Sequence, residues 1–180
     1  MAGFSIHLAI GKRYIEKHKL EIENEEEFYR GIIAPDLYEG NYKNKSESHY
    51  GMWGDYQAIT NIDEFLKDSK VDMNKDYWKG YFVHLLSDYY FYQKDFCKEY
   101  SEIIKNSDKF YYDYDCLNKE LVEMYDIPKL DSIDKYMNCI EEQPKYLKKD
   151  KVMKYIEKVS DLNIKDGVKI IKEKGMEGLK

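Results

Sequence analysis

The stretch that decides the fold is Tyr77-Trp-Lys-Gly-Tyr-Phe-Val-His-Leu-Leu-Ser-Asp-Tyr-Tyr-Phe-Tyr92. Apart from the tyrosines, its ionisable side chains are Lys79, His84 and Asp88. A helix of this composition is apolar on nearly every face, and such a helix is buried on most sides. The stretch is also too short to cross a bilayer. We therefore expect a central helix at about residues 74–94 that other helices enclose.

His84 and Asp88 are four residues apart, so they share one face of the expected helix. Burying a carboxylate there is unfavourable unless a hydrogen bond or an opposite charge compensates it. A metal ion would neutralise Asp88 and take the imidazole of His84 as a second ligand. The alternative is a structural hydrogen bond between the two side chains, without any ion.

The rest of the chain predicts an all-α fold, with residues 1–180 forming a single helical domain of about eight helices. Asn24 precedes three glutamates, which is typical of a helix N-cap and first turn. Pro35 is expected to end that helix, because the residue before a proline disfavours the α conformation. Residues 37–60 are expected to form a long loop that can include a short helical turn. Further helices are expected at residues 4–17, from 61 onward, at 95–106, from Asp113 or Asp115 to Met124, and at 132–142, 152–159 and 164–171.

The formal net charge of −6 is unevenly distributed. Residues 145–180 contain eleven lysines and six acidic residues, so the remainder carries a net charge of −11. An acidic body attracts cations, and we expect no binding to a nucleic-acid duplex. Cys97, Cys116 and Cys139 form no Cys-x-x-Cys pair, which suits a reducing compartment. We expect neither a signal peptide nor a transmembrane segment, and therefore a cytoplasmic protein.

Three of the four histidines lie in apolar or aromatic surroundings, whereas His18 lies in a lysine-rich polar segment. Two aspartates can join them, one after an Ala-Pro pair and one in the central helix. A mixture of imidazole and carboxylate ligands suits Zn²⁺, and also Mn²⁺ or Fe²⁺. The candidate metal ligands, all in the first half of the chain, are His7, Asp36, His49, His84 and Asp88.

The order of these residues resembles that of the zinc-dependent phospholipase C family. A histidine near the N-terminus is followed by Gly31-Ile-Ile-Ala-Pro-Asp36, a loop histidine and Gly80-Tyr-Phe-Val-His-Leu-Leu-Ser-Asp88. That family is all-helical and hydrolyses phosphodiesters at a cluster of zinc ions, and the S1/P1 nucleases share its fold. The resemblance covers about the first half of the chain. It implies a hydrolase whose substrate is a small phosphate ester or a lipid headgroup.

The resemblance also implies roles for single residues. By the family pattern, one metal ion is bound by Asp36, His49, His84 and Asp88. Asp88 bridges to a second ion that His7 holds. Asp36 is in the position discussed as a general base, which makes it the candidate catalytic residue.

Two features of the family are absent from this sequence. The chain begins with methionine and not with the processed tryptophan that the family uses as a ligand, and no histidine follows His84. That part of the family site is therefore either missing or replaced by carboxylates such as Asp95. Because these ligands are absent, we expect one or two ions and not three. Tyr50, Trp53 and Tyr81 are expected to line the pocket.

Two other functions stay open at this point. A non-catalytic helical protein could use the same residues to hold a structural metal ion. A closed four-ligand site favours that alternative, and a site with an open position favours an enzyme. A nucleotide phosphohydrolase of the HD type also builds His/Asp sites on helices, but its pattern requires a His-Asp dipeptide, which this sequence lacks.

Overall fold

The structure is a computed structural model that describes residues 3–53, 58–91 and 107–174. Within these ranges the regular secondary structure is helical apart from one short pair of β-strands, so the predicted all-α class is confirmed. Two 3₁₀ turns span Lys19–Glu21 and Asp134–Tyr136. The α-helices are α1 (Phe4–Lys17), α2 (Glu25–Leu37), α3 (Lys45–Ser48), α4 (Ile62–Lys67), α5 (Asp76–Phe91), α8 (Ser107–Tyr125), α9 (Lys149–Ser160) and α10 (Ile164–Lys174), and the strands are β1 (Gly51–Trp53) and β2 (Ala58–Thr60).

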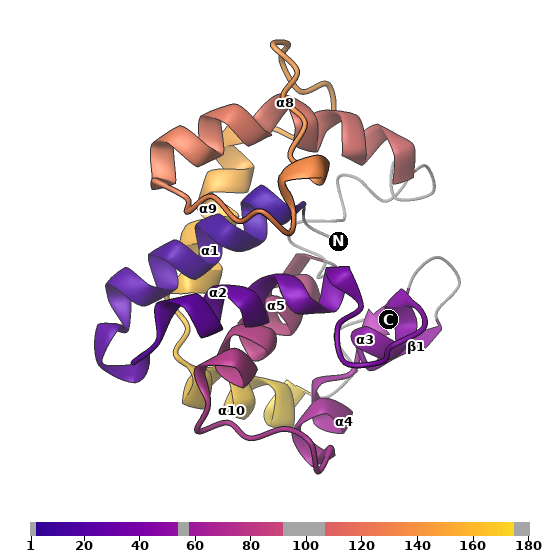
Figure 1. The fold of residues 1–180 in the computed structure, drawn as a ribbon, viewed down its shortest axis with the longest axis vertical. Coiled ribbons are helices and arrows are strands. Elements are labelled where there is room, and N and C mark those ends of the chain that lie inside the picture. The colour runs from indigo at the N-terminus through magenta and orange to yellow at the C-terminus, as the bar shows by residue number, and fades with distance from the viewer. Residues whose placement is uncertain (1–2, 54–57, 92–106, 175–180) are drawn as a thin grey trace.

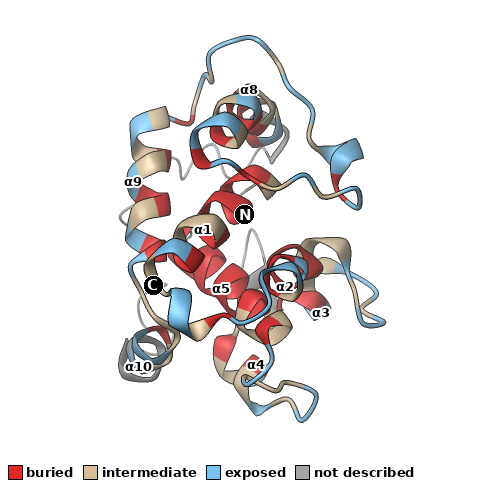
Figure 2. Ribbon diagram, turned by 60° about the vertical axis from the view of Figure 1, so that its left-hand side comes forward, coloured by how far each residue is buried: buried red, intermediate tan, exposed pale blue. Residues whose placement is uncertain are grey.

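The central helix α5 is enclosed by its neighbours, as the sequence predicts. Every residue from Gly80 to Phe91 is buried. Helix α2 packs along α5, and α1, α4, α9 and α10 also contact it. Figure 2 shows α5 as a mostly red ribbon in the middle of the molecule, and Figure 1 shows α8 and α10 toward opposite ends. None of the helices in the described ranges combines the length and the apolarity needed to cross a membrane.

Helix starts agree with the N-cap signals in the sequence. The Asn24 side chain accepts a hydrogen bond from the backbone N–H of Glu27 (3.1 Å) at the start of α2. Asn61 does the same for Glu64 (3.2 Å) at the start of α4. Each cap satisfies an N–H group that has no partner inside its helix. The central helix begins at Asp76, and residues 92–94 of its expected range lie outside the described residues.

Two facing glycines bring α2 and α5 into backbone contact. A Cβ atom on Gly31 would lie 1.9 Å from the carbonyl oxygen of Tyr77, and a Cβ atom on Gly80 would lie 2.0 Å from that of Phe28. Neither distance leaves room for any side chain. The crossing therefore requires glycine on both helices, and it fixes how α2 and α5 are placed against each other.

Gly31→Ala is expected to destabilise the fold by about 1–3 kcal/mol, because backbone atoms of α5 must move to admit the methyl group. Gly11→Ala on α1 is the matched control. Its Cβ would meet only side-chain atoms, the nearest being Ile32 Cγ1 at 3.3 Å, and alanine favours the helix. Urea unfolding compares the two variants. Equal stabilities for Gly31→Ala and the natural chain would show that the crossing is not tight.

Pro35 does not end α2, contrary to the prediction from the sequence. The helix continues through Asp36 to Leu37 and ends at Tyr38, which has a left-handed conformation (φ 55°). Proline so close to a helix end removes one N–H donor, the partner of the Gly31 carbonyl, and costs little else. Burial of Ala34 and Pro35 in the core favours the helical path. Asp36 therefore lies inside the last turn of α2.

The segment 37–60, expected to be a loop, contains α3 and the hairpin of β1 and β2. The strands pair antiparallel, with Gly51 opposite Thr60 and Trp53 opposite Ala58. Strands of three residues are too short to show a clear alternation of apolar and polar side chains, so they could not be predicted from the pattern.

Two further predictions on the C-terminal side are wrong. Helix α8 extends from Ser107, so Asp113 and Asp115 lie inside it and do not cap it. The segment 132–142 forms one 3₁₀ turn instead of an α-helix. Backbone groups of this segment form hydrogen bonds with α8. The Asn138 carbonyl accepts from the Asn118 side chain (2.7 Å), and the Ile140 N–H donates to the Asp115 carbonyl (3.0 Å). The helix expected at 95–106 lies outside the described residues.

Asp113 anchors the segment that follows α8. Its buried carboxylate accepts the backbone N–H groups of Lys145 (2.8 Å), Tyr146 (2.6 Å) and Leu147 (2.6 Å). Hydrogen bonds to an ionised acceptor are stronger than neutral ones. This carboxylate therefore fixes the path of the chain into α9.

Asp113→Asn is expected to lower the free energy of unfolding by about 2 kcal/mol, because an amide NH₂ group then faces backbone donors. Asp115→Asn on the same helix is the control, since that carboxylate accepts only a 3.5 Å bond from Asn118. Urea unfolding measures both variants. If they lose the same stability, the three bonds to Asp113 contribute nothing particular to the fold.

Candidate metal centre

The five candidate residues come from four helices and meet above one face of α5. His7 lies in α1, Asp36 in the last turn of α2, His49 directly after α3, and His84 and Asp88 in α5. Four of the five side chains are at most 1% exposed, and Asp36 is 10% exposed. The sequence analysis therefore selected side chains that the fold brings together.

Nitrogen and oxygen atoms of the five side chains face one another at short range. The Nε2 atoms of His49 and His84 are 3.1 Å apart. Asp88 Oδ2 lies 3.3 Å from His49 Nε2 and 3.6 Å from His84 Nε2. Asp36 Oδ1 lies 3.5 Å from His49 Nε2. Asp36, His49 and His84 thus form one group whose ligand atoms lie within 4.8 Å of one another.

A second group shares His84 with the first and adds His7 and Asp88. The other carboxylate oxygen of Asp88, Oδ1, lies 3.5 Å from His7 Nε2. The rings of His7 and His84 stack with centroids 3.8 Å apart and 14° between their planes. The two oxygens of Asp88 therefore face different imidazoles, which is the orientation of a bridging carboxylate.

Hydrogen bonds at Nδ1 fix the tautomers of the rings. His84 Nδ1 lies 2.7 Å from the carbonyl oxygen of Ile32, and His49 Nδ1 lies 2.8 Å from that of Lys45. A carbonyl oxygen only accepts, so both Nδ1 atoms must carry the hydrogen. His7 Nδ1 lies 2.8 Å from the Ser87 hydroxyl, which itself donates to the His84 carbonyl (2.8 Å) and is thus left to accept from His7.

In the neutral rings, therefore, all three Nε2 lone pairs point into the centre. At 3.1 Å, two bare Nε2 atoms repel each other unless a proton or a cation lies between them. A proton on His49 would satisfy that contact, but it would leave His7 Nε2, which is buried without a hydrogen-bond partner among the described residues. Burial of an unsatisfied acceptor is costly. A divalent cation satisfies all three nitrogens, so the residues present fit a metal ion.

The local charges favour two carboxylate anions and a neutral His7. Burial alone would raise the pKa of Asp36, but the Lys45 ammonium and the His49 ring hold that pKa below its usual range. Burial would likewise raise the pKa of Asp88, but the adjacent His49 and His84 rings lower it well below the usual value. Burial and the neighbouring His84 lower the pKa of His7 to about 3.

The pKa of His49 is shifted upward, opposite to that of His7. Burial lowers its pKa, but hydrogen bonds to Asp36 and Asp88 outweigh burial and raise the pKa above the ordinary value. A proton on His49 therefore competes with a metal ion for the same nitrogen. Metal affinity falls as the pH falls, because more His49 then carries that proton.

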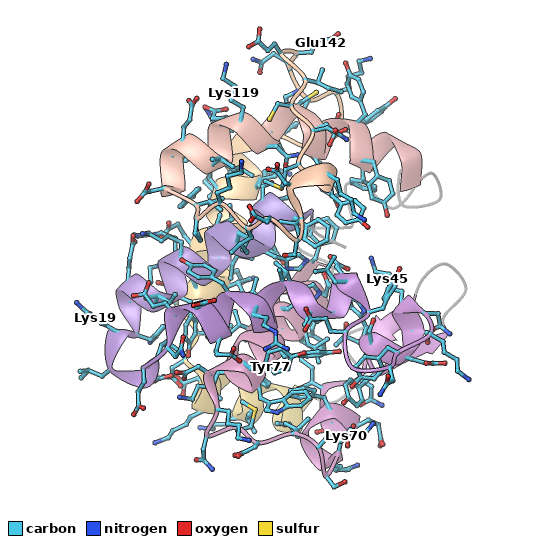
Figure 3. The ribbon with its side chains drawn as sticks, in the orientation of Figure 1. Lys19, Lys45, Lys70, Tyr77, Lys119 and Glu142 are labelled. Atoms are coloured by element: carbon cyan, nitrogen blue, oxygen red, sulfur yellow. The ribbon has the colours of Figure 1, made fainter. Side chains whose placement is uncertain are left out.

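Lys45 is a charged neighbour of the candidate ligands that was not predicted from the sequence. Its ammonium nitrogen lies 3.1 Å from Asp36 Oδ1, and Figure 3 shows its side chain beside the C-terminal end of α2. The available signal was its position four residues before His49, on the same turn of helix. A lysine in a lysine-rich chain does not stand out by composition.

The tyrosines expected to line a pocket are instead structural neighbours of His49. Tyr81 is fully buried, and its hydroxyl donates to the Ser48 carbonyl. The hydroxyl of Tyr50 bonds to Tyr42 (2.8 Å) and Asp68 (2.7 Å). The Tyr81 bond holds the end of α3, and with it His49, against α5. The side chain of Trp53, like all of Asp95, lies outside the described part of the chain.

Comparison with known proteins adds no relative to this description. No protein-family model, curated protein or solved structure matches the chain.

Proposed function

We propose that the protein is a metal-dependent hydrolase of phosphate esters, with Zn²⁺, Mn²⁺ or Fe²⁺ bound by His7, Asp36, His49, His84 and Asp88. The observation that carries the proposal is the convergence of three Nε2 lone pairs and two carboxylates in one buried centre. The resemblance of the residue order to the zinc-dependent phospholipase C family supports the choice of reaction. A divalent ion in this centre supplies Lewis-acid activation of water and of a phosphoryl group.

The buried and the partly exposed candidate ligands would have different roles. His84 and Asp88, buried on α5, hold the ion and fix its place. Asp36 is the ligand that reaches solvent. Its pKa, held below the usual range by Lys45 and His49, keeps it anionic at neutral pH. As an anion at the solvent side, Asp36 can orient a water molecule or accept its proton.

Protein purified without chelator is expected to contain one tightly bound transition-metal ion per chain, measured by elemental analysis. His84→Ala should release it, because His84 Nε2 belongs to both groups of ligand atoms. His7→Ala should spare the tight ion and remove at most a weaker second one. Chelation should lower the unfolding temperature, because an ion that binds only the folded state stabilises it.

His18→Ala is the matched control for metal content, since His18 bonds to the Ser160 carbonyl (3.0 Å) and takes no part in the centre. Metal-free natural protein, or full metal content in His84→Ala, would contradict the assignment.

Asp36→Asn is expected to slow metal-dependent hydrolysis of bis(p-nitrophenyl) phosphate about 10²-fold or more, while circular dichroism shows an unchanged fold. The amide keeps one oxygen as a ligand but cannot accept a proton. Glu26→Gln, exposed on the same helix, is the control. A panel of phosphodiesters and phosphomonoesters that shows no turnover with Zn²⁺, Mn²⁺ or Fe²⁺ would refute the proposal of catalysis.

One observation favours a second candidate, a structural metal ion. Four of the five ligands are at most 1% exposed, as in a closed structural site. The two candidates differ in whether the ion has a position open to solvent. A Co²⁺-substituted protein whose visible spectrum responds to added phosphate has such a position, whereas an unresponsive spectrum supports the structural role.

A further inference from the structure

Lys45 contributes two separate groups to the centre. Its carbonyl oxygen accepts the hydrogen of His49 Nδ1 (2.8 Å), and its ammonium nitrogen lies 3.1 Å from Asp36 Oδ1. Its side chain is 33% exposed, against 10% for Asp36. Lys45 therefore stands at the solvent side of an otherwise buried cluster.

The ammonium group has three hydrogens to donate. The contact with Asp36 takes one of them, and because the side chain is partly exposed, the other two can be donated to an acceptor that arrives from solvent. A compact positive charge on a flexible stem is well suited to phosphoryl oxygens. An anion that approaches along Asp36 therefore meets the ammonium of Lys45.

The charge of the centre also depends on Lys45. A divalent ion and the ammonium together exceed the two carboxylates, Asp36 and Asp88, by one positive charge. A second divalent ion would add two more charges within a few ångströms, in surroundings that screen them poorly. The ammonium thus disfavours a second ion and leaves a net charge that suits an anionic ligand.

We propose that Lys45 is the second cation of the centre: it limits tight binding to one divalent ion and binds the phosphoryl oxygens of the ligand. The proposal rests on the proposed metal site and names the residue that recognises the anion. Lys45 acts by direct contact with that anion, beside Asp36 at the solvent side of the cluster.

The test uses Zn²⁺-loaded protein and inorganic phosphate, with isothermal titration calorimetry for phosphate and elemental analysis for zinc. Lys45→Met should weaken phosphate binding at least tenfold and admit a second zinc ion. Lys45→Arg, which keeps the charge, should bind one ion and retain most of the phosphate affinity. Exposed Lys43→Met is the matched control and should behave as the natural chain. All three variants keep the backbone carbonyl that orients His49.

The failures are distinguishable. Unchanged phosphate affinity and a single zinc ion in Lys45→Met would overturn the role of Lys45 and leave the metal site standing. Natural protein that holds zinc but binds no phosphate would do the same. Natural protein without zinc would overturn the metal site and this inference together.

Discussion

The backbone contact between α2 and α5 at Gly31 and Gly80 is the constraint on which the centre depends. A Cβ atom on either glycine would lie 1.9–2.0 Å from a carbonyl oxygen of the other helix. One residue further along α2, the Ile32 carbonyl is close enough to accept from His84 Nδ1 (2.7 Å). One turn further, Asp36 reaches the imidazoles of α1 and α3. If the two helices were further apart, the hydrogen bond from His84 Nδ1 to Ile32 would break and Asp36 would move away from the imidazoles.

Because the centre is buried, its charged groups interact more strongly than they would at the surface. Asp88 is inaccessible to solvent on a helix whose last twelve described residues are all buried. In such surroundings both the attraction between opposite charges and the cost of an unmatched charge grow. The imidazoles, with their Nδ1 atoms bonded to Ile32, Lys45 and Ser87, leave little freedom for the centre to relax. Its five side chains are therefore arranged before any ligand arrives.

Local signals explain which parts of this structure were predictable from the sequence. The bounds of α1, the caps at Asn24 and Asn61 and the burial of α5 depend on neighbouring residues, so pattern and propensity sufficed. The prediction that Pro35 ends α2 was wrong because burial of Pro35 in the core outweighed its local preference. The role of Asp113 was not predicted because the residues whose N–H groups it accepts lie more than thirty positions away. The five candidate residues that meet above α5 could be selected from the sequence because polar residues in apolar surroundings are conspicuous. Lys45 could not be selected, since a lysine at a surface needs no explanation until its partner is known.

A buried polar cluster that serves only the fold alternates donors and acceptors, so that each lone pair faces a hydrogen. The cluster around His84 is built the other way. Its Nδ1–H groups point outward to acceptors, and the acceptor atoms of three rings and two carboxylates point inward. The ammonium of Lys45 meets this convergence at Asp36, where the side chains reach solvent. An inward array of acceptors is stabilised by a cation at its centre, and this requirement is the physical basis of the proposed metal site.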